Sequence, residues 1–209
     1  MTDRGATVDA PSSELDDRLQ RVAAALRSHN IEAIIVSTGD EAREAVLGLI
    51  PEGAEVHSGK SKTLADVGLF SELMESGRYD ALRTRLGKLD RATQGAEMRK
   101  LMATPDFMLG SVAAITVDGA LVAASATGSQ LSGYASGAGR VILVVGSQKI
   151  VTDLDAAMTR IREVVFPYEN AQVRALLGVD TALQKVLVIY GEWREGRTTV
   201  VLVREPVGV

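Results

Sequence analysis

The sequence contains no cysteine among its 209 residues. Without a thiol, the chain can form no disulfide, no thiolate zinc site and no iron–sulfur cluster, and it has no thiol nucleophile. Its own side chains therefore carry no electrons in a redox reaction. Histidine is also scarce, with two residues and no accompanying carboxylate motif, so the sequence predicts no metal site and no intrinsic cofactor.

Excess positive charge and uninterrupted apolar segments are absent as well. The formal net charge is −4, which argues against nucleic acid or an anionic membrane as a partner. Residues 1–14 contain no apolar stretch, so we expect no secretory signal and a cytoplasmic location. The apolar run from Phe107 to Ala126 could span a membrane by length, but Asp118-Gly119 interrupts it and favours a hairpin.

What the sequence does contain is an alternation of strand-like and helical segments. An amphipathic helix is predicted from Ser13 to about Ser28, because leucine and valine recur at helical spacing. Strand-like runs at 32–36 and 54–57 are each followed by a helical segment. Two successive strand–helix units are typical of a parallel sheet with a Rossmann-like winding.

The second half predicts further elements of both kinds. They are a hairpin within 108–124, a buried strand at 141–145, a helix at 154–165 ended by Pro167, a helix at 169–177, and strands at 185–190 and 198–203. We therefore expect an α/β fold: a Rossmann-like, mostly parallel sheet with helices on both faces, plus a hairpin and a late strand pair. Residues 1–11 are expected to form a flexible tail and residues 12–209 a single domain.

The first candidate binding segment follows the strand at 54–57. Its small, hydroxyl-bearing and basic residues at a predicted helix start could cradle a phosphate or carboxylate. A plain glycine turn before a capped helix explains the pattern equally well, and the spacing is not that of a nucleotide-binding P-loop. The candidate ligand-binding residues here are Ser58, Gly59, Lys60, Ser61 and Thr63.

Two further segments are candidates for binding a small anion. The glycine-rich loop contributes Gly128, Ser129 and Gln130, because closely spaced glycines let the backbone approach a ligand, although they also allow a tight or mobile loop. Gly146 and Lys149 follow the strand at 141–145, where open α/β sheets place their ligands. A lysine just after a strand is more often a solvated loop residue.

Catalytic candidates are weaker. Asp118 and Thr116 lie in the predicted hairpin, where Asp118 is first a turn residue and only second a catalytic carboxylate. His57 ends a strand beside the first candidate loop and could act as an acid, a base or an anion ligand.

A longer stretch resembles a known family. The segment LGSVAAITVDGALVAASATGSQLSGYASGAGRVILVVGSQKIVTDLDAAMTRIREVVFPYENAQVR is similar to the second half of LUD (lactate-utilisation) domains, such as lactate-utilisation protein C. The segment DEAREAVLGLIPEGAEVHSGKSKTLADVGL resembles their first half. The resemblance implies a fold related to glucosamine-6-phosphate deaminases, ribose-5-phosphate isomerases and CoA transferases. It also implies an association with the oxidation of L-lactate to pyruvate, with iron–sulfur partner subunits carrying the electrons.

Two departures from the family bear on function. The cysteine cluster that many short members carry near the C-terminus is replaced here by GVDTALQKVLVIYGEWREGRTT. Val117 stands where the family often has an acidic residue. If that carboxylate is catalytic in the family, this member is either impaired or uses Asp118 instead.

Three functions remain open. They are an accessory or ligand-binding subunit in lactate oxidation, a non-redox enzyme acting on a phosphosugar or a CoA thioester, and a non-catalytic anion sensor or scaffold. A small anionic metabolite is expected under all three, and homo-oligomerisation stays open. Because parallel strands end at one sheet edge, the loops after Val56 and Val145 should meet in one anion-binding mouth beside the glycine-rich segment.

Overall fold

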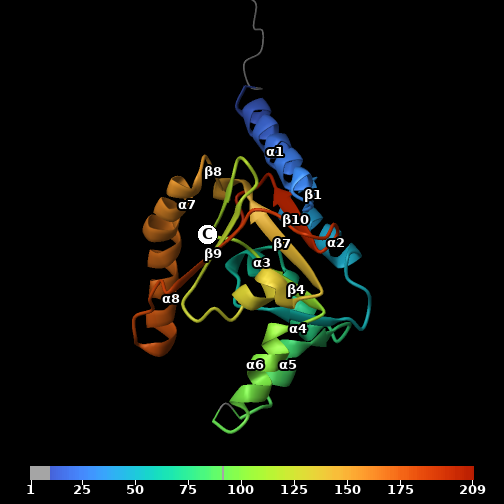
Figure 1. Ribbon diagram of the computed structural model, residues 1–209, viewed down its shortest axis with the longest axis vertical. Coiled ribbons are helices and arrows are strands. Elements are labelled where there is room, and N and C mark those ends of the chain that lie inside the picture. Colours follow the sequence, from blue (N-terminus) through green and yellow to red (C-terminus); the bar gives the residue numbers. More distant parts are fainter. Residues whose placement is uncertain (1–9, 91) are drawn as a thin grey trace, which may run out of the picture.

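A computed structural model describes residues 10–90 and 92–209 of the chain (Figure 1). Residues 1–9 of the predicted tail lie outside this part, and the first helix begins at Ala10, ahead of the predicted start at Ser13. The helices are α1 (Ala10–Ser28), α2 (Gly39–Gly48), α3 (Lys62–Asp66), α4 (Leu69–Glu75), α5 (Leu82–Leu86), α6 (Gly95–Ala103), α7 (Leu154–Arg160) and α8 (Phe166–Leu177). Three short irregular turns complete them: π turns η1 (Gly133–Gly137) and η3 (Ile161–Val165), and a 3₁₀ turn η2 (Ser147–Lys149).

The larger of two sheets has six strands, and every pairing in it is parallel. Its order is β1 (Glu32–Val36), β10 (Thr198–Val203), β7 (Arg140–Gly146), β4 (Phe107–Gly110), β2 (Glu55–Ser58) and β3 (Asp80–Ala81). The predicted Rossmann-like parallel sheet is confirmed. β7 lies inside the sheet and is buried from Val141 to Gly146, as its continuous apolar sequence predicts.

The smaller sheet has the order β8 (Ile150–Val151), β5 (Ala114–Thr116), β6 (Leu121–Ser125) and β9 (Lys185–Ile189). β5 and β6 pair antiparallel around Gly119, whose φ of 91° lies in the left-handed region that glycine adopts without strain. The hairpin at Asp118-Gly119 is therefore confirmed. Its predicted first strand is divided, however, because Met108 belongs to β4 of the larger sheet.

The predicted late strand pair is wrong. Both strands exist, but β9 pairs antiparallel with β6, whereas β10 is inserted between β1 and β7 of the larger sheet. The reason is burial. All six residues of β10 are buried, which fits a strand inside a parallel sheet, while β9 is partly exposed and lies at the edge of the smaller sheet.

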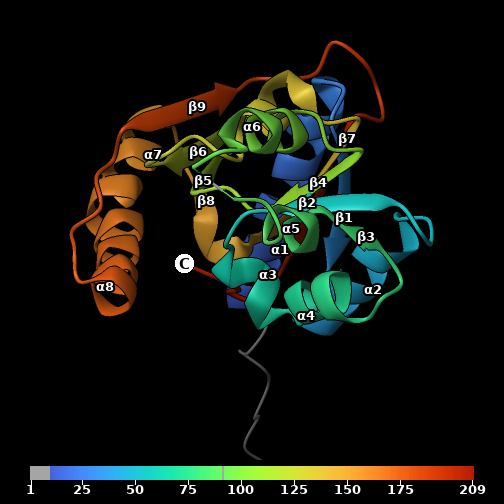
Figure 2. The same cartoon turned by 90° about the horizontal axis from the view of Figure 1, so that it is seen from below.

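The elements form four layers, which Figure 2 shows from a second direction. One face of the larger sheet packs on α2, α3 and α4, and the other face packs on α1 and on the smaller sheet. The smaller sheet is covered on its far side by α7 and η3. The alternation along β7 places Leu143 in the core on the α1 face and Ile142 and Val144 in the core on the α2 face.

Pro167 does not end a helix, contrary to the prediction. α7, η3 and α8 follow one another without a break and form the column at the left of Figure 1. Asp153 caps the start of α7, where its side chain accepts a hydrogen bond from the Ala156 N–H, as predicted. Pro167 is tolerated because it lies in the first turn of α8, directly after the π turn, where a missing N–H costs little.

Within the described residues, no helix combines the length and the apolar character needed to cross a membrane.

Candidate functional site

A pocket of about 310 Å³ lies where loops from both sheets meet. Residues 59–63 after β2, Gly110 and the link 111–113 after β4, and Lys149 after β7 line it from the larger sheet. Residues 123–127, Ser129 and Gln130 line it from the smaller sheet, and the start of α8 with residues 181–183 closes another side. Residues 59–63 and Lys149 come together because β2 and β7 belong to one parallel sheet and end at the same edge. The glycine-rich loop follows β6 of the smaller sheet and lines the same pocket.

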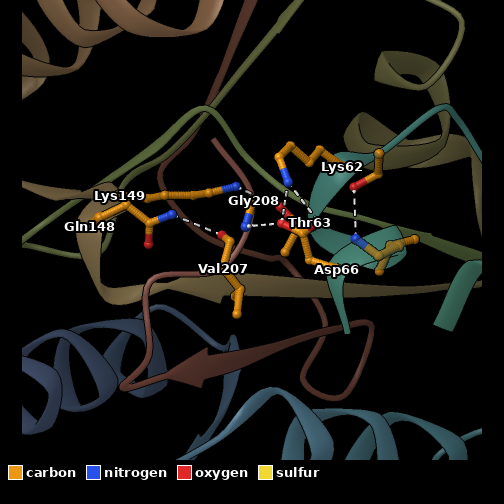
Figure 3. A network of polar contacts seen from close by, with 9 residues as sticks. Lys62, Thr63, Asp66, Gln148, Lys149, Val207 and Gly208 are labelled. Carbon is orange, nitrogen blue, oxygen red and sulfur yellow. Dashed lines mark hydrogen bonds and ion pairs between the residues drawn. The ribbon is translucent and has the colours of Figure 1, made fainter. Parts of the chain in front are cut away.

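Lys149 is the charged group at the base of this arrangement (Figure 3). The 3₁₀ turn η2 directs it inward, and it is only 3% exposed, so it is not a solvated loop residue. Its Nζ donates to Thr63 Oγ1 at 2.7 Å and to Ser111 Oγ at 2.9 Å. No carboxylate of the described residues forms a salt bridge with it.

Burial lowers the pKa of Lys149 to about 7. The main cause is loss of hydration around the ammonium group, since the charged form is disfavoured in a medium of low polarity. The nearby Arg160 guanidinium lowers the pKa further, and Asp66 acts weakly in the opposite direction. Near neutral pH, Lys149 is therefore present both as an ammonium and as a free amine.

The two hydroxyl partners of Lys149 come from separate elements. Thr63 lies in α3, whose start is capped by Ser61, with the hydroxyl accepting from the Leu64 N–H at 3.3 Å. Ser111 lies in the link between β4 and β5, where its hydroxyl donates to the Val144 carbonyl at 2.6 Å. Because that hydrogen is used, the Ser111 oxygen is oriented to accept from Lys149.

A strap formed by residues 206–208 covers Lys149 and is fastened at two points. Gln148 Nε2 donates to the Val207 carbonyl at 2.9 Å, and the Gly208 N–H donates to Asp66 Oδ2 at 3.0 Å. Gly208 has a φ of 81°, and a Cβ placed on it would lie 2.0 Å from Thr63 Oγ1. Only glycine can pass this closely over the Thr63–Lys149 pair, which Figure 3 shows beside the strap.

The pocket lining carries more positive than negative charge. Three lysines, Lys60, Lys62 and Lys149, line it together with one acidic residue, Glu169. Lys62 is partly neutralised, because its Nζ lies 2.6 Å and 2.7 Å from the carboxylate oxygens of Asp66, and this hydrogen bond raises the pKa of Lys62. The remaining surplus of positive charge suits an anionic ligand.

Seven of the predicted site residues line this pocket: Gly59, Lys60, Ser61, Thr63, Ser129, Gln130 and Lys149. Ser58 is buried beneath it, with its hydroxyl donating to the Gly59 carbonyl. Gly128 and Gly146 are not part of the pocket lining. The Gly128 N–H donates to the Ser125 hydroxyl, and Gly146 lies against Val207 of the strap.

His57 is not part of the pocket lining. It is buried in β2, its Nδ1 has no hydrogen-bond partner, and burial together with the charge of Arg83 lowers its pKa to about 4. The ring is therefore neutral at physiological pH. Its position offers no contact with a ligand in the pocket.

Thr116 and Asp118 also lie away from the pocket, in the β5–β6 turn. The Thr116 hydroxyl donates to the Asp118 carboxylate and accepts from the Ala120 N–H at 2.9 Å. Asp118 is exposed, whereas Thr116 is buried. The geometry is that of a turn braced by its own side chains.

Asp118→Asn should therefore leave the melting temperature within about 2 °C of the parent value, since asparagine keeps an acceptor for Thr116 and favours turns. Thermal unfolding followed by circular dichroism measures this. Loss of ligand binding with an unchanged melting curve would instead place Asp118 in the functional site.

Two residues at the site had no signal in the sequence. Ser111 is an isolated serine whose role depends on its position between the two sheets. Tyr134 belongs to η1 in the glycine-rich loop, lines the pocket, and donates from its hydroxyl to the Ser111 carbonyl at 3.3 Å. Burial raises the pKa of the Tyr134 phenol, so it stays protonated and keeps the Ser111 link in place.

Across residues 10–90 and 92–209, no three histidine, aspartate or glutamate side chains gather in a way that could hold a metal ion. The polar groups of the pocket are hydroxyls, amides, amines and the Glu169 carboxylate. The chemistry that this set can perform is anion recognition, amine nucleophilicity and proton transfer.

The fold and the pocket together define an α/β protein with a pocket over the carboxyl edge of a parallel sheet. Residues 19–203 match the LUD domain family, and the chain belongs to that family. The resemblance seen in the sequence is thereby confirmed. Membership relates the chain to lactate utilisation at the level of the family.

A solved structure supports the same fold. The chain is similar to the crystal structure of a DUF162 family protein from Deinococcus radiodurans, with a TM-score of 0.52 and 13% sequence identity. The similarity covers 91% of this chain and 98% of that chain. No curated protein matches the chain.

Proposed function

We propose that this chain binds a small organic anion, a 2-hydroxy or 2-oxo acid, and serves as a ligand-binding or accessory component in the oxidation of L-lactate to pyruvate. One observation carries the proposal. Lys149 is buried at the pocket without a salt bridge to a carboxylate of the described residues. A buried cation without a partner is costly, and a ligand carboxylate would stabilise it.

The rest of the pocket supports a small ligand of this kind. Its volume of about 310 Å³ lies at the lower end of the range for small-molecule sites. The Ser61, Thr63 and Gln130 side chains around it can hydrogen-bond a carboxylate and a neighbouring hydroxyl or keto oxygen.

Electron transfer would take place elsewhere in such a system. The chain has no cysteine and hence no ligand for an iron–sulfur cluster. Iron–sulfur partner subunits would receive the electrons, while this chain would hold the acid or stabilise the assembly.

Adding pyruvate or L-lactate in large excess should raise the melting temperature of the purified protein. A ligand that binds only the folded state stabilises it by about 2.7 kcal/mol at a hundredfold excess over its dissociation constant, which is about 5–10 °C for a chain of this size. Differential scanning fluorimetry across a concentration series measures the shift. Inorganic phosphate and a CoA thioester are tested in parallel, to show whether other anions raise the melting temperature as well.

Lys149→Met should abolish the shift, because it removes the cation but retains the length and apolar body of the side chain. Lys88→Met is the matched control, since Lys88 is exposed and does not line the pocket. If neither acid shifts the parent protein, or if Lys149→Met responds as strongly as Lys88→Met, the proposed function is wrong.

A further inference from the structure

We propose that Lys149 forms an imine with the carbonyl carbon of a small 2-oxo acid in this pocket. The proposal rests on the proposed function, which places such an acid at the same residues, and adds a covalent step to it. Lys149 differs from its neighbours in burial, because Lys60 and Lys62 line the same pocket but are exposed at its surface.

The first requirement for an imine is an amine that loses its proton readily. Lys62 does not meet it, because its ammonium is held by both carboxylate oxygens of Asp66. Lys149 has only hydroxyl partners, which stabilise an ammonium less than a carboxylate does. Its pKa, lowered to about 7 by burial and by Arg160, allows a nucleophilic amine to be present near neutral pH.

The second requirement is a set of groups that handle the protons. When the Lys149 nitrogen attacks the ketone carbon, a C–N bond forms, the carbonyl oxygen takes up a proton, and the amine releases one, which gives a carbinolamine. Loss of its hydroxyl as water then leaves the C=N bond. Amine and ketone thus yield imine and one water, with no change of oxidation state.

The hydroxyls next to Lys149 are placed for these transfers. Ser111 donates its hydrogen to the Val144 carbonyl, so its oxygen accepts from the Lys149 nitrogen and orients the lone pair. Thr63 lies 2.7 Å from the same nitrogen, and its hydroxyl can donate to a neutral amine or to the carbinolamine oxygen. Two hydroxyls from separate elements therefore position one amine.

The charge of the lining selects an acid over a neutral carbonyl compound. The pocket presents three lysines and one glutamate, so a carboxylate next to the ketone is attracted. When Lys149 is neutral, Lys60, which lines the pocket and is exposed, still carries positive charge and can hold that carboxylate.

The experiment is trapping of the imine in the full chain. The protein is incubated with pyruvate and sodium cyanoborohydride, which reduces an imine to a stable secondary amine, and the modified lysine is located by peptide mass spectrometry. We expect one adduct per chain, on Lys149, at least tenfold above any other lysine. Its rate should increase as the pH rises from 6 to 8.

L-Lactate provides the matched ligand control. It has the same carboxylate but no ketone, so it should give no adduct, and in excess it should slow labelling by pyruvate. This competition uses the unmodified protein and does not depend on the folding of a variant. Lys149→Met should lose the adduct, and Lys88→Met should retain it.

The outcomes separate this proposal from the proposed function. A melting shift with pyruvate but no adduct on Lys149 would leave anion binding intact and overturn the imine. Labelling spread evenly over the exposed lysines, Lys60 and Lys62 included, would overturn it as well. Absence of both shift and adduct would overturn both proposals.

Discussion

Replacing Lys149 by methionine should make the protein more stable at pH 6 and less stable above about pH 10.5. Lys149 has a pKa of about 7 in the folded state and an ordinary value of 10.5 when exposed in the unfolded chain. Between these values the unfolded chain binds more protons, so the stability of the parent protein rises with pH across this window. Below about pH 7 the full penalty for burying the ammonium is present.

The size of the effect follows from the two pKa values. Each unit of difference corresponds to about 1.4 kcal/mol, which gives a penalty of roughly 3–5 kcal/mol at pH 6. The variant escapes this penalty but loses the hydrogen bonds to Thr63 and Ser111, at a cost of about 1–2 kcal/mol at every pH. A net gain of roughly 1–4 kcal/mol is expected at pH 6.

Urea unfolding of parent and variant at half-unit steps from pH 6 to 11 measures the difference directly. Taking the difference between the two proteins cancels the titration of the groups that they share. Arg160 and Asp66, whose charges act on Lys149, are present in both. A difference that does not change with pH would show that Lys149 keeps an ordinary pKa.

Arg197→Met should destabilise the protein by roughly 3–5 kcal/mol, although Arg197 lies away from the pocket. Arg197 and Glu192 form an ion pair at 2.5 Å, with side chains only 13% and 9% exposed. Removing one member leaves the other charge buried without its partner, which costs several kcal/mol. The arginine also donates to the carbonyls of Gly133, Tyr134 and Ala138, so it holds η1 and the glycine-rich loop against the start of β10.

Urea unfolding at pH 7 tests this, with Arg194→Met as the control because Arg194 is exposed. The control should change stability by less than about 0.5 kcal/mol. Arg197→Met should also weaken ligand binding, since Tyr134 of the loop lines the pocket. Equal stability of the two variants would contradict the role assigned to the ion pair.

Most strands could be predicted because the pattern of apolar residues in a strand indicates which of its faces are buried. The run Val141–Val145 predicts a strand covered on both faces, and β7 is such a strand. The run at 198–203 carries the same signal, yet nothing in it specifies a neighbour. Pairing of β10 with β1 and β7 depends on contacts with residues far away in the sequence, whereas proximity in the chain suggested β9.

The loops that form the site could be predicted from the sequence, but the burial and the lowered pKa of Lys149 could not. Parallel strands end at one edge, so the convergence of residues 59–63 and Lys149 on one pocket follows from the fold class. The burial of Lys149 does not follow, because its cover consists of Thr63, Ser111 and the strap at 206–208. Short-range patterns also gave His57 a place beside the loop, although a strand residue can face the core instead.

The position of β10 has a consequence for how the chain is made. β1 has one neighbour in its sheet, β10, and the ribosome synthesises β1 long before β10. Until then β1 has no strand to pair with, and β7 lacks one of its two neighbours. Such long-range parallel pairing is slow and leaves strand edges open to other chains. The larger sheet can therefore be completed only after β10 has been synthesised, and β1 and β7 keep open edges until then.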